Sequence, residues 1–69
     1  MYQLIDRPRE VSQHQKAFDV LDAAYGTDEF SVEDAIIAIM TGLEINRAQA
    51  TRAWNMLVDN VNVSDGYTM

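Results

Sequence analysis

The sequence predicts a mostly α-helical domain of three helices followed by a short C-terminal β-hairpin. Three apolar stripes recur at helical spacing, separated by Gly26 and Gly42, and such stripes mark the buried faces of helices. After the third stripe the pattern changes to alternation on either side of Asp65 and Gly66, a dipeptide that favours a two-residue hairpin turn. With 69 residues the chain has room for one domain with one modest core.

The first helix is expected to begin either with Pro8 in its first turn or with Ser12 as its N-cap. Gly26 supplies the left-handed residue that commonly ends a helix. The apolar stripe between these positions consists of Ala17, Phe18, Leu21, Ala24 and Tyr25. We expect residues 1–10 to form an extended N-terminal arm and residues 11–69 to form the single domain.

The second helix is expected to follow a short connection with one or two residues of strand at Phe30. Ser31 is typical of an N-cap and Gly42 of a helix end. The apolar stripe of this helix consists of Val32, Ala35, Ile36, Ile39 and Met40.

The third helix is expected to cover residues 46–59. Asn46 stands three residues before Gln49, the spacing of a capping box, and Asn60 is the expected left-handed residue at the helix end. The buried stripe should consist of Ala50, Ala53, Trp54, Leu57 and Val61. That spacing makes Trp54 a core anchor rather than a base-stacking platform. The hairpin would then place Val61 and Val63 on one strand and Tyr67 and Met69 on the other.

The order of these elements, and three of their segments, resemble the winged helix-turn-helix family. INRAQATRAWNMLVDN, residues 45–60, resembles the third helix of its regulators. FSVEDAI, residues 30–36, is similar to the entry into the second helix, and VNVSDGYTM, residues 61–69, to a reduced wing. The resemblance implies a three-helix winged helix-turn-helix with a short C-terminal β-hairpin. It also implies a binding function, because members of the family bind either DNA or protein.

The chain departs from the usual pattern of this family in three places. The turn from Gly42 to Asn46 is longer than the tight turn of the DNA-reading members, which would change the angle between the second and third helices. Val61 stands where a glycine often ends the third helix, and the wing carries no arginine or lysine at its tip.

The outward face of the third helix is the candidate DNA-binding site of a transcriptional regulator, with duplex DNA as its partner. Arginine suits guanine in the major groove, and asparagine or glutamine suits adenine. The candidate residues are Asn46, Arg47, Gln49, Thr51, Arg52 and Asn55. The arm around Arg7 and Arg9 would assist. An ordinary solvated helix face explains the same residues, and two arginines would release few counterions, so binding would be weak without dimerisation.

The negative charge suggests a different partner. The net charge is −6, and residues 1–44 carry all of it, with nine acids against three bases. An acidic surface could occupy the nucleic-acid-binding groove of a basic protein, as a phage- or virus-type inhibitor or adaptor would. The candidate acids are Asp19, Asp22, Asp28, Glu29, Glu33 and Asp34. A solvated face and an adaptation to high salt are the alternatives.

Catalysis, cofactors and metals have little support in the sequence. The chain has no cysteine, no glycine-rich phosphate loop and one histidine, His14, so we expect neither an enzyme nor a metal site. The longest apolar run, residues 35–40, is too short to span a bilayer, and no secretory leader is apparent. These features favour a cytoplasmic protein without membrane association, and a homodimer stays open.

Overall fold

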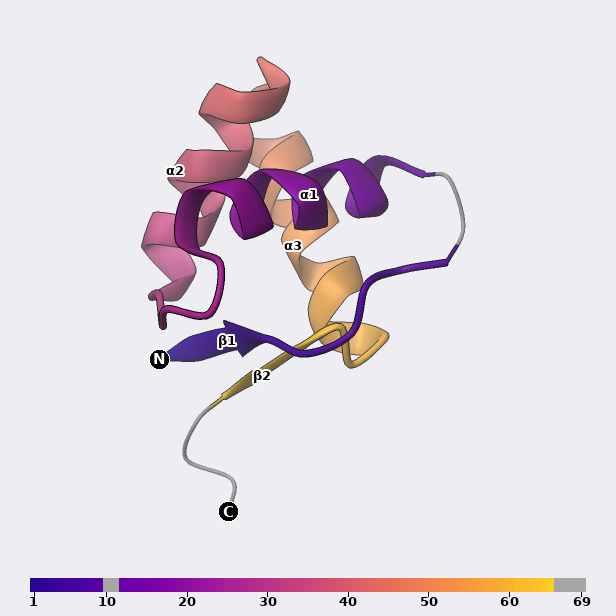
Figure 1. Ribbon diagram of the computed structural model, residues 1–69. Coiled ribbons are helices and arrows are strands. Elements are labelled where there is room, and N and C mark those ends of the chain that lie inside the picture. Colours follow the sequence, from indigo (N-terminus) through magenta and orange to yellow (C-terminus); the bar gives the residue numbers. More distant parts are fainter. Residues whose placement is uncertain (10–11, 66–69) are drawn as a thin grey trace.

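Three helices pack on one another beside a two-stranded antiparallel sheet in the computed structural model of the chain, which describes residues 1–9 and 12–65 (Figure 1). The elements in chain order are β1 (Tyr2–Leu4), α1 (Gln13–Tyr25), α2 (Val32–Leu43), α3 (Arg47–Asp59) and β2 (Val63–Asp65). Each helix packs against both of the others. No helix in these two described stretches is long and apolar enough to cross a membrane.

The core lies where the three helices meet the sheet, and the sequence stripes predict most of it. It consists of Ala17, Phe18, Leu21, Phe30, Ala35, Ile36, Ile39, Ala50, Ala53, Trp54, Leu57 and Val63. The Trp54 ring packs edge-on against Tyr2, with ring centroids 5.0 Å apart, and against Phe30 at 6.0 Å. Trp54 is 3% exposed, which confirms it as a core anchor.

The sheet joins the two ends of the described chain. β1 pairs antiparallel with β2, so that Leu4 lies opposite Val63. Tyr2 also forms an isolated bridge with Phe30, which confirms the short strand expected there. β1, part of the segment expected as an arm, therefore lies between Phe30 and β2. Asp65 ends β2 rather than lying in a turn, and the rest of the expected hairpin, residues 66–69, is outside the described residues.

Polar side chains cap the N-termini of two helices, as the sequence predicts. The Ser31 hydroxyl accepts a hydrogen bond from the Asp34 N–H at 3.1 Å. The Asn46 side-chain oxygen accepts one from the Gln49 N–H at 2.9 Å. Each bond satisfies a backbone donor that the first turn leaves without a helical partner. Ser12 occupies the N-cap position of α1 but makes no side-chain capping bond.

The end of α2 differs from the prediction. Gly26 adopts a positive φ of 59° after α1 as expected, but Gly42 lies inside α2. Glu44 is the left-handed residue instead, with φ 55° and ψ 49°, and its N–H bonds to the Met40 carbonyl. The prediction of a long turn starting at Gly42 was therefore wrong. Only residues 44–46 connect α2 to α3, which is the length typical of a helix-turn-helix.

The end of α3 also differs. Asn60 stays right-handed with φ −91°, while Val61 has φ 57° and is 63% exposed, so both the predicted left-handed residue and the predicted burial of Val61 were wrong. The Asn62 N–H bonds to the Leu57 carbonyl, and the Val61 N–H bonds to the Val58 carbonyl. This is the bonding pattern of a Schellman motif, which requires a left-handed residue at the position of Val61.

Val61→Gly is expected to stabilise the domain by roughly 0.5–1 kcal/mol. The left-handed conformation costs a residue with a side chain about 1–2 kcal/mol, and the greater freedom of glycine in the unfolded chain offsets part of the gain. Urea denaturation followed by circular dichroism measures the change. Val58→Gly is the matched control: it lies within right-handed α3 and is 37% exposed, so it should destabilise. A loss of stability from Val61→Gly as large as that from Val58→Gly would contradict the assignment.

Candidate nucleic-acid interface

The outward face of α3 carries the predicted DNA-contacting residues. Because Ala50, Ala53, Trp54 and Leu57 are buried against α1, α2 and the sheet, the opposite side of the helix faces solvent. Arg47, Gln49, Arg52 and Asn55 are exposed there, and Thr51 is half-buried. Residues three or four apart on a helix are neighbours, so Thr51, Arg52 and Asn55 form one continuous polar strip.

Arg47 is engaged by an acid from the neighbouring helix. Its two terminal nitrogens donate to the two carboxylate oxygens of Glu33, both within 3.1 Å. The pair links the first turn of α2 to the first residue of α3, and both side chains are more than half exposed. Glu33 belongs to the predicted acidic patch, so the two candidate surfaces meet at this ion pair.

Both members of the ion pair are charged at neutral pH. The hydrogen bonds from Arg47 hold the pKa of the Glu33 carboxyl below its ordinary value, and the pKa of the Arg47 guanidinium is raised in turn. A carboxyl whose pKa is lowered by folding contributes stability above its unfolded pKa and loses that contribution as the pH falls through the lowered value. DNA would therefore have to displace an ionised Glu33 to reach Arg47.

The remaining candidates on α3 differ in what they can offer a base or a phosphate. Arg52 is exposed and has no ion pair or hydrogen bond with any residue in the described stretches. The Asn46 side-chain oxygen already accepts one hydrogen bond at the cap. A two-bond contact with adenine would therefore require this oxygen to accept a second hydrogen bond or to leave the cap.

The arm contributes a second ion pair of the same kind. Arg7 donates from Nε and one terminal nitrogen to the two oxygens of Asp19, at 2.9 and 3.0 Å. These bonds lower the pKa of Asp19. Of the two arm arginines expected to assist DNA binding, Arg7 is thus held by α1, and Arg9 is exposed with no ion pair to a described residue.

The predicted acidic patch is only partly balanced by these two pairs. Four of its six carboxylates form no ion pair within the described part of the chain, and all four are exposed: Asp22, Asp28, Glu29 and Asp34. The first turn of α2 holds Asp34 next to Glu33, where the positive end of the helix dipole favours acids without any partner. These carboxylates are exposed, but their exposure alone does not require a ligand.

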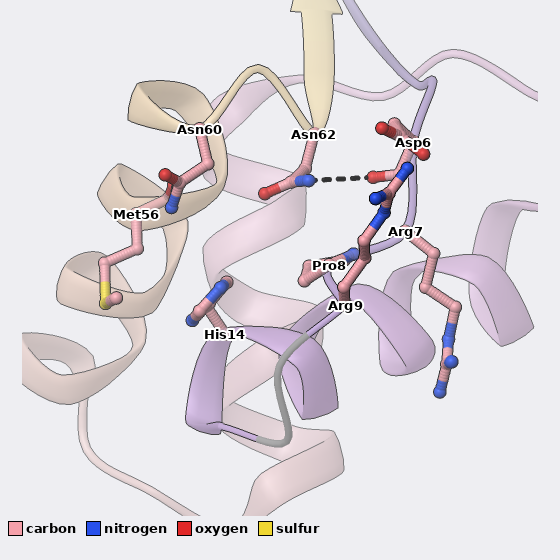
Figure 2. A pocket seen from close by; sticks show the side chains of 8 residues that line it. All are labelled: Asp6, Arg7, Pro8, Arg9, His14, Met56, Asn60 and Asn62. Atoms are coloured by element: carbon pink, nitrogen blue, oxygen red, sulfur yellow. Dashed lines mark hydrogen bonds between the residues drawn. The ribbon is translucent and has the colours of Figure 1, made fainter.

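Sequence reasoning missed both ion pairs and a hollow beside the arm. Helical spacing relates residues within one helix, whereas Glu33 and Arg47 meet across two helices. The hollow, of about 420 Å³, is formed by Asp6, Arg7, Pro8, Arg9, His14, Met56, Asn60 and Asn62 (Figure 2). No spacing in the sequence indicates that residues 6–9, His14 and residues 56–62 come together in the fold.

Comparisons of the chain with models of protein families, with curated proteins and with solved structures found no match.

Proposed function

We propose that this domain binds duplex DNA by placing α3 in the major groove, as a small winged helix-turn-helix regulator. The observation that carries the proposal is the three-residue connection from α2 to an α3 whose polar face is turned to solvent. This face includes Arg52, which pairs with no residue in the described ranges. A helix with its side chains is about 10–12 Å across, and the major groove is about 12 Å wide. Thirteen residues make α3 roughly 20 Å long, enough to follow the groove over several base pairs.

The proposed contacts are few, so binding should be weak and only moderately dependent on salt. The Arg52 guanidinium is available to contact a phosphate directly, whereas Arg47 must first break its ion pair with Glu33. Two neutralised phosphates predict a slope of about −2 in a plot of log affinity against log salt concentration. The net charge of −6 opposes the approach of DNA at long range, and this opposition weakens as salt rises.

A second candidate function is favoured by the four carboxylates around the α1–α2 connection that form no ion pair with a described residue. In this alternative the domain binds a basic protein surface, and α3 does not contact DNA. Glu33 separates the two functions because it restrains Arg47 in the first and contributes to the binding surface in the second.

Glu33→Gln is therefore expected to tighten DNA binding by about two- to fivefold, the range for one exposed ion pair. The substitution releases Arg47 and removes a negative charge next to the proposed groove contact. Arg52→Ala should weaken binding by at least about fivefold and lower the salt slope by about one. Fluorescence anisotropy of labelled random duplex DNA, at about 50 and about 200 mM salt, measures both changes.

Asp19→Asn is the matched control, since it makes the same charge change in the other bidentate arginine pair. An equal gain from Asp19→Asn and Glu33→Gln would show that the effect is not specific to α3, since the lost negative charge or the released Arg7 would account for it. Absence of DNA binding at the lower salt, with Arg52→Ala silent, would refute the proposal. Binding to a basic polypeptide that weakens in Glu33→Gln would then support the second candidate.

A further inference from the structure

The side of β1 that faces away from β2 is paired at one residue only. Tyr2 exchanges two backbone hydrogen bonds with Phe30, at 2.7 and 2.9 Å. In a strand the backbone groups of alternate residues point to the same side, so those of Leu4 also point away from β2. The Ile5 N–H bonds to the Asn62 carbonyl on the opposite side, as this alternation requires. The Leu4 N–H and C=O therefore have no hydrogen-bond partner among the described residues.

The position beside Leu4 is open because the chain turns away from β1 just before Phe30. A strand that continued the Tyr2–Phe30 pair would place Asp28 opposite Leu4. The Asp28 N–H bonds instead to the Tyr25 carbonyl in the turn after α1. Figure 1 shows β1 with β2 on one side and with α1 and the α1–α2 connection on the other. A groove of about 450 Å³ lies on this second side, lined by Gln3, Leu4, Ile5, Phe18, Asp22, Gly26 and Thr27.

The groove offers an extended peptide a place to add to the sheet. One residue of an added antiparallel strand can exchange two hydrogen bonds with the N–H and C=O of Leu4, which is how peptides bind to open sheet edges. Residues directly opposite each other in such a pair direct their side chains to the same face of the sheet. Leu4 packs against the helical core. The peptide residue opposite Leu4 would therefore point its side chain toward α1.

The α1 helix presents an aromatic ring and a carboxylate to that side chain. Phe18 and Asp22 lie one turn apart on α1, and both line the groove. Asp22 is exposed and forms no ion pair with a described residue, because both hydrogen bonds from Arg7 go to Asp19. A lysine side chain can lay its methylene stem on apolar surface while its ammonium reaches a charged or solvated group. The groove thus matches lysine in both respects.

We propose that this groove binds an extended, lysine-bearing segment of a partner protein as an added strand beside β1. The lysine backbone pairs with Leu4, its stem lies on Phe18 and its ammonium pairs with Asp22. The residues flanking the lysine point to the opposite face, where Ile5 is 53% exposed and offers them apolar contact. This proposal deepens the second candidate function by naming a site for a basic partner, and it does not rest on DNA binding by α3.

The test is titration of the isotopically labelled protein with the peptide acetyl-Val-Lys-Val-amide, followed by the NMR resonance of the Leu4 backbone amide. Valine on either side of the lysine favours the extended conformation. The Leu4 resonance should shift saturably, with a dissociation constant on the order of 1 mM. A peptide methylated at the lysine backbone nitrogen cannot donate to the Leu4 carbonyl and should bind about three- to tenfold more weakly. Norleucine in place of lysine removes the ammonium and should weaken binding about two- to fivefold.

Asp22→Asn should weaken binding of the lysine peptide about two- to fivefold and leave the norleucine peptide unaffected, because norleucine has no ammonium to pair. Asp34→Asn is the matched control: Asp34 is exposed, forms no ion pair with a described residue and lies on α2, outside the groove lining. It should leave binding of both peptides unchanged.

The proposal is overturned if the lysine peptide causes no saturable shift of the Leu4 amide, or if the backbone-methylated peptide binds as tightly. Equal losses from Asp22→Asn and Asp34→Asn would overturn it as well, because they would show an effect of net charge. A shift of the Leu4 amide with protein concentration alone would make a second copy of the chain the occupant. A basic polypeptide that binds the domain without shifting the Leu4 amide would support the second candidate function and still overturn this site.

Discussion

Trp54→Ala is expected to remove about 3–5 kcal/mol of stability, the range for deleting a large buried aromatic side chain. Trp54 is 3% exposed and is the α3 residue whose ring packs against both β1, through Tyr2, and Phe30. The loss would combine a cavity with two broken aromatic contacts. A domain of 69 residues has a total stability of only about 3–10 kcal/mol. Most molecules of the variant should therefore be unfolded or close to it at 37 °C.

Urea denaturation followed by far-ultraviolet circular dichroism measures this loss, with Trp54→Phe as an intermediate variant. Val58→Ala is the control on the same helix, because Val58 is 37% exposed and its truncation should change stability by no more than about 0.5 kcal/mol. A cost below about 1 kcal/mol for Trp54→Ala would mean that the ring is not a core anchor. Loss of nucleic-acid binding with stability unchanged would assign Trp54 to base stacking instead.

The sequence predicted the helices well because their determinants are local. The apolar stripes around Leu21, Ile39 and Leu57 are each contained within four turns of helix, and Leu21, Ile39 and Leu57 are fully buried. The caps at Ser31 and Asn46 depend on a residue only three positions away. Such patterns need no knowledge of the tertiary structure.

The sheet and the candidate site were harder to predict from the sequence, because they depend on contacts between distant parts of the chain. β1 pairs with β2 across almost the whole described chain, and no local pattern indicates that residues 2–4 return to residues 63–65. Periodicity correctly placed Arg52 on the solvent side of α3. It could not show that Arg47 would be held by Glu33, because the angle between two helices decides which of their side chains meet.

The helix ends show where local rules conflict with the fold. Gly42 and Asn60 are the residues that usually take the left-handed conformation, yet Glu44 and Val61 take it instead. α2 continues past Gly42 to Leu43, and after α3 the left-handed residue comes one position beyond the C-cap Asn60. For Gly42 the structure supplies a reason: a β-carbon at this position would lie 2.6 and 2.8 Å from the two γ-carbons of Val20 in α1. Glycine is needed there for close helix packing rather than for a turn.

Gly42→Ala is accordingly expected to destabilise the domain, although alanine is the better helix former. Overpacking costs about 1–3 kcal/mol, whereas the change from glycine to alanine within a helix gains about 1 kcal/mol. Val20 is half-buried and β-branched, so its side chain has one strongly preferred rotamer in a helix and cannot easily turn aside. The net loss should be roughly 0.5–2 kcal/mol, measured by urea denaturation.

The decisive comparison is the same substitution in a Val20→Ala background. Val20→Ala removes both γ-carbons that a β-carbon at position 42 would meet, so Gly42→Ala should then stabilise by about 0.5–1 kcal/mol through helix propensity alone. A reversal of sign would show that the α1–α2 approach requires the glycine. An equal loss in both backgrounds would refute the contact with Val20. Because Gly42 lies just before the connection to α3, a wider α1–α2 spacing would also shift α3. Under the proposed DNA-binding function, the reversal should therefore appear in DNA affinity as well.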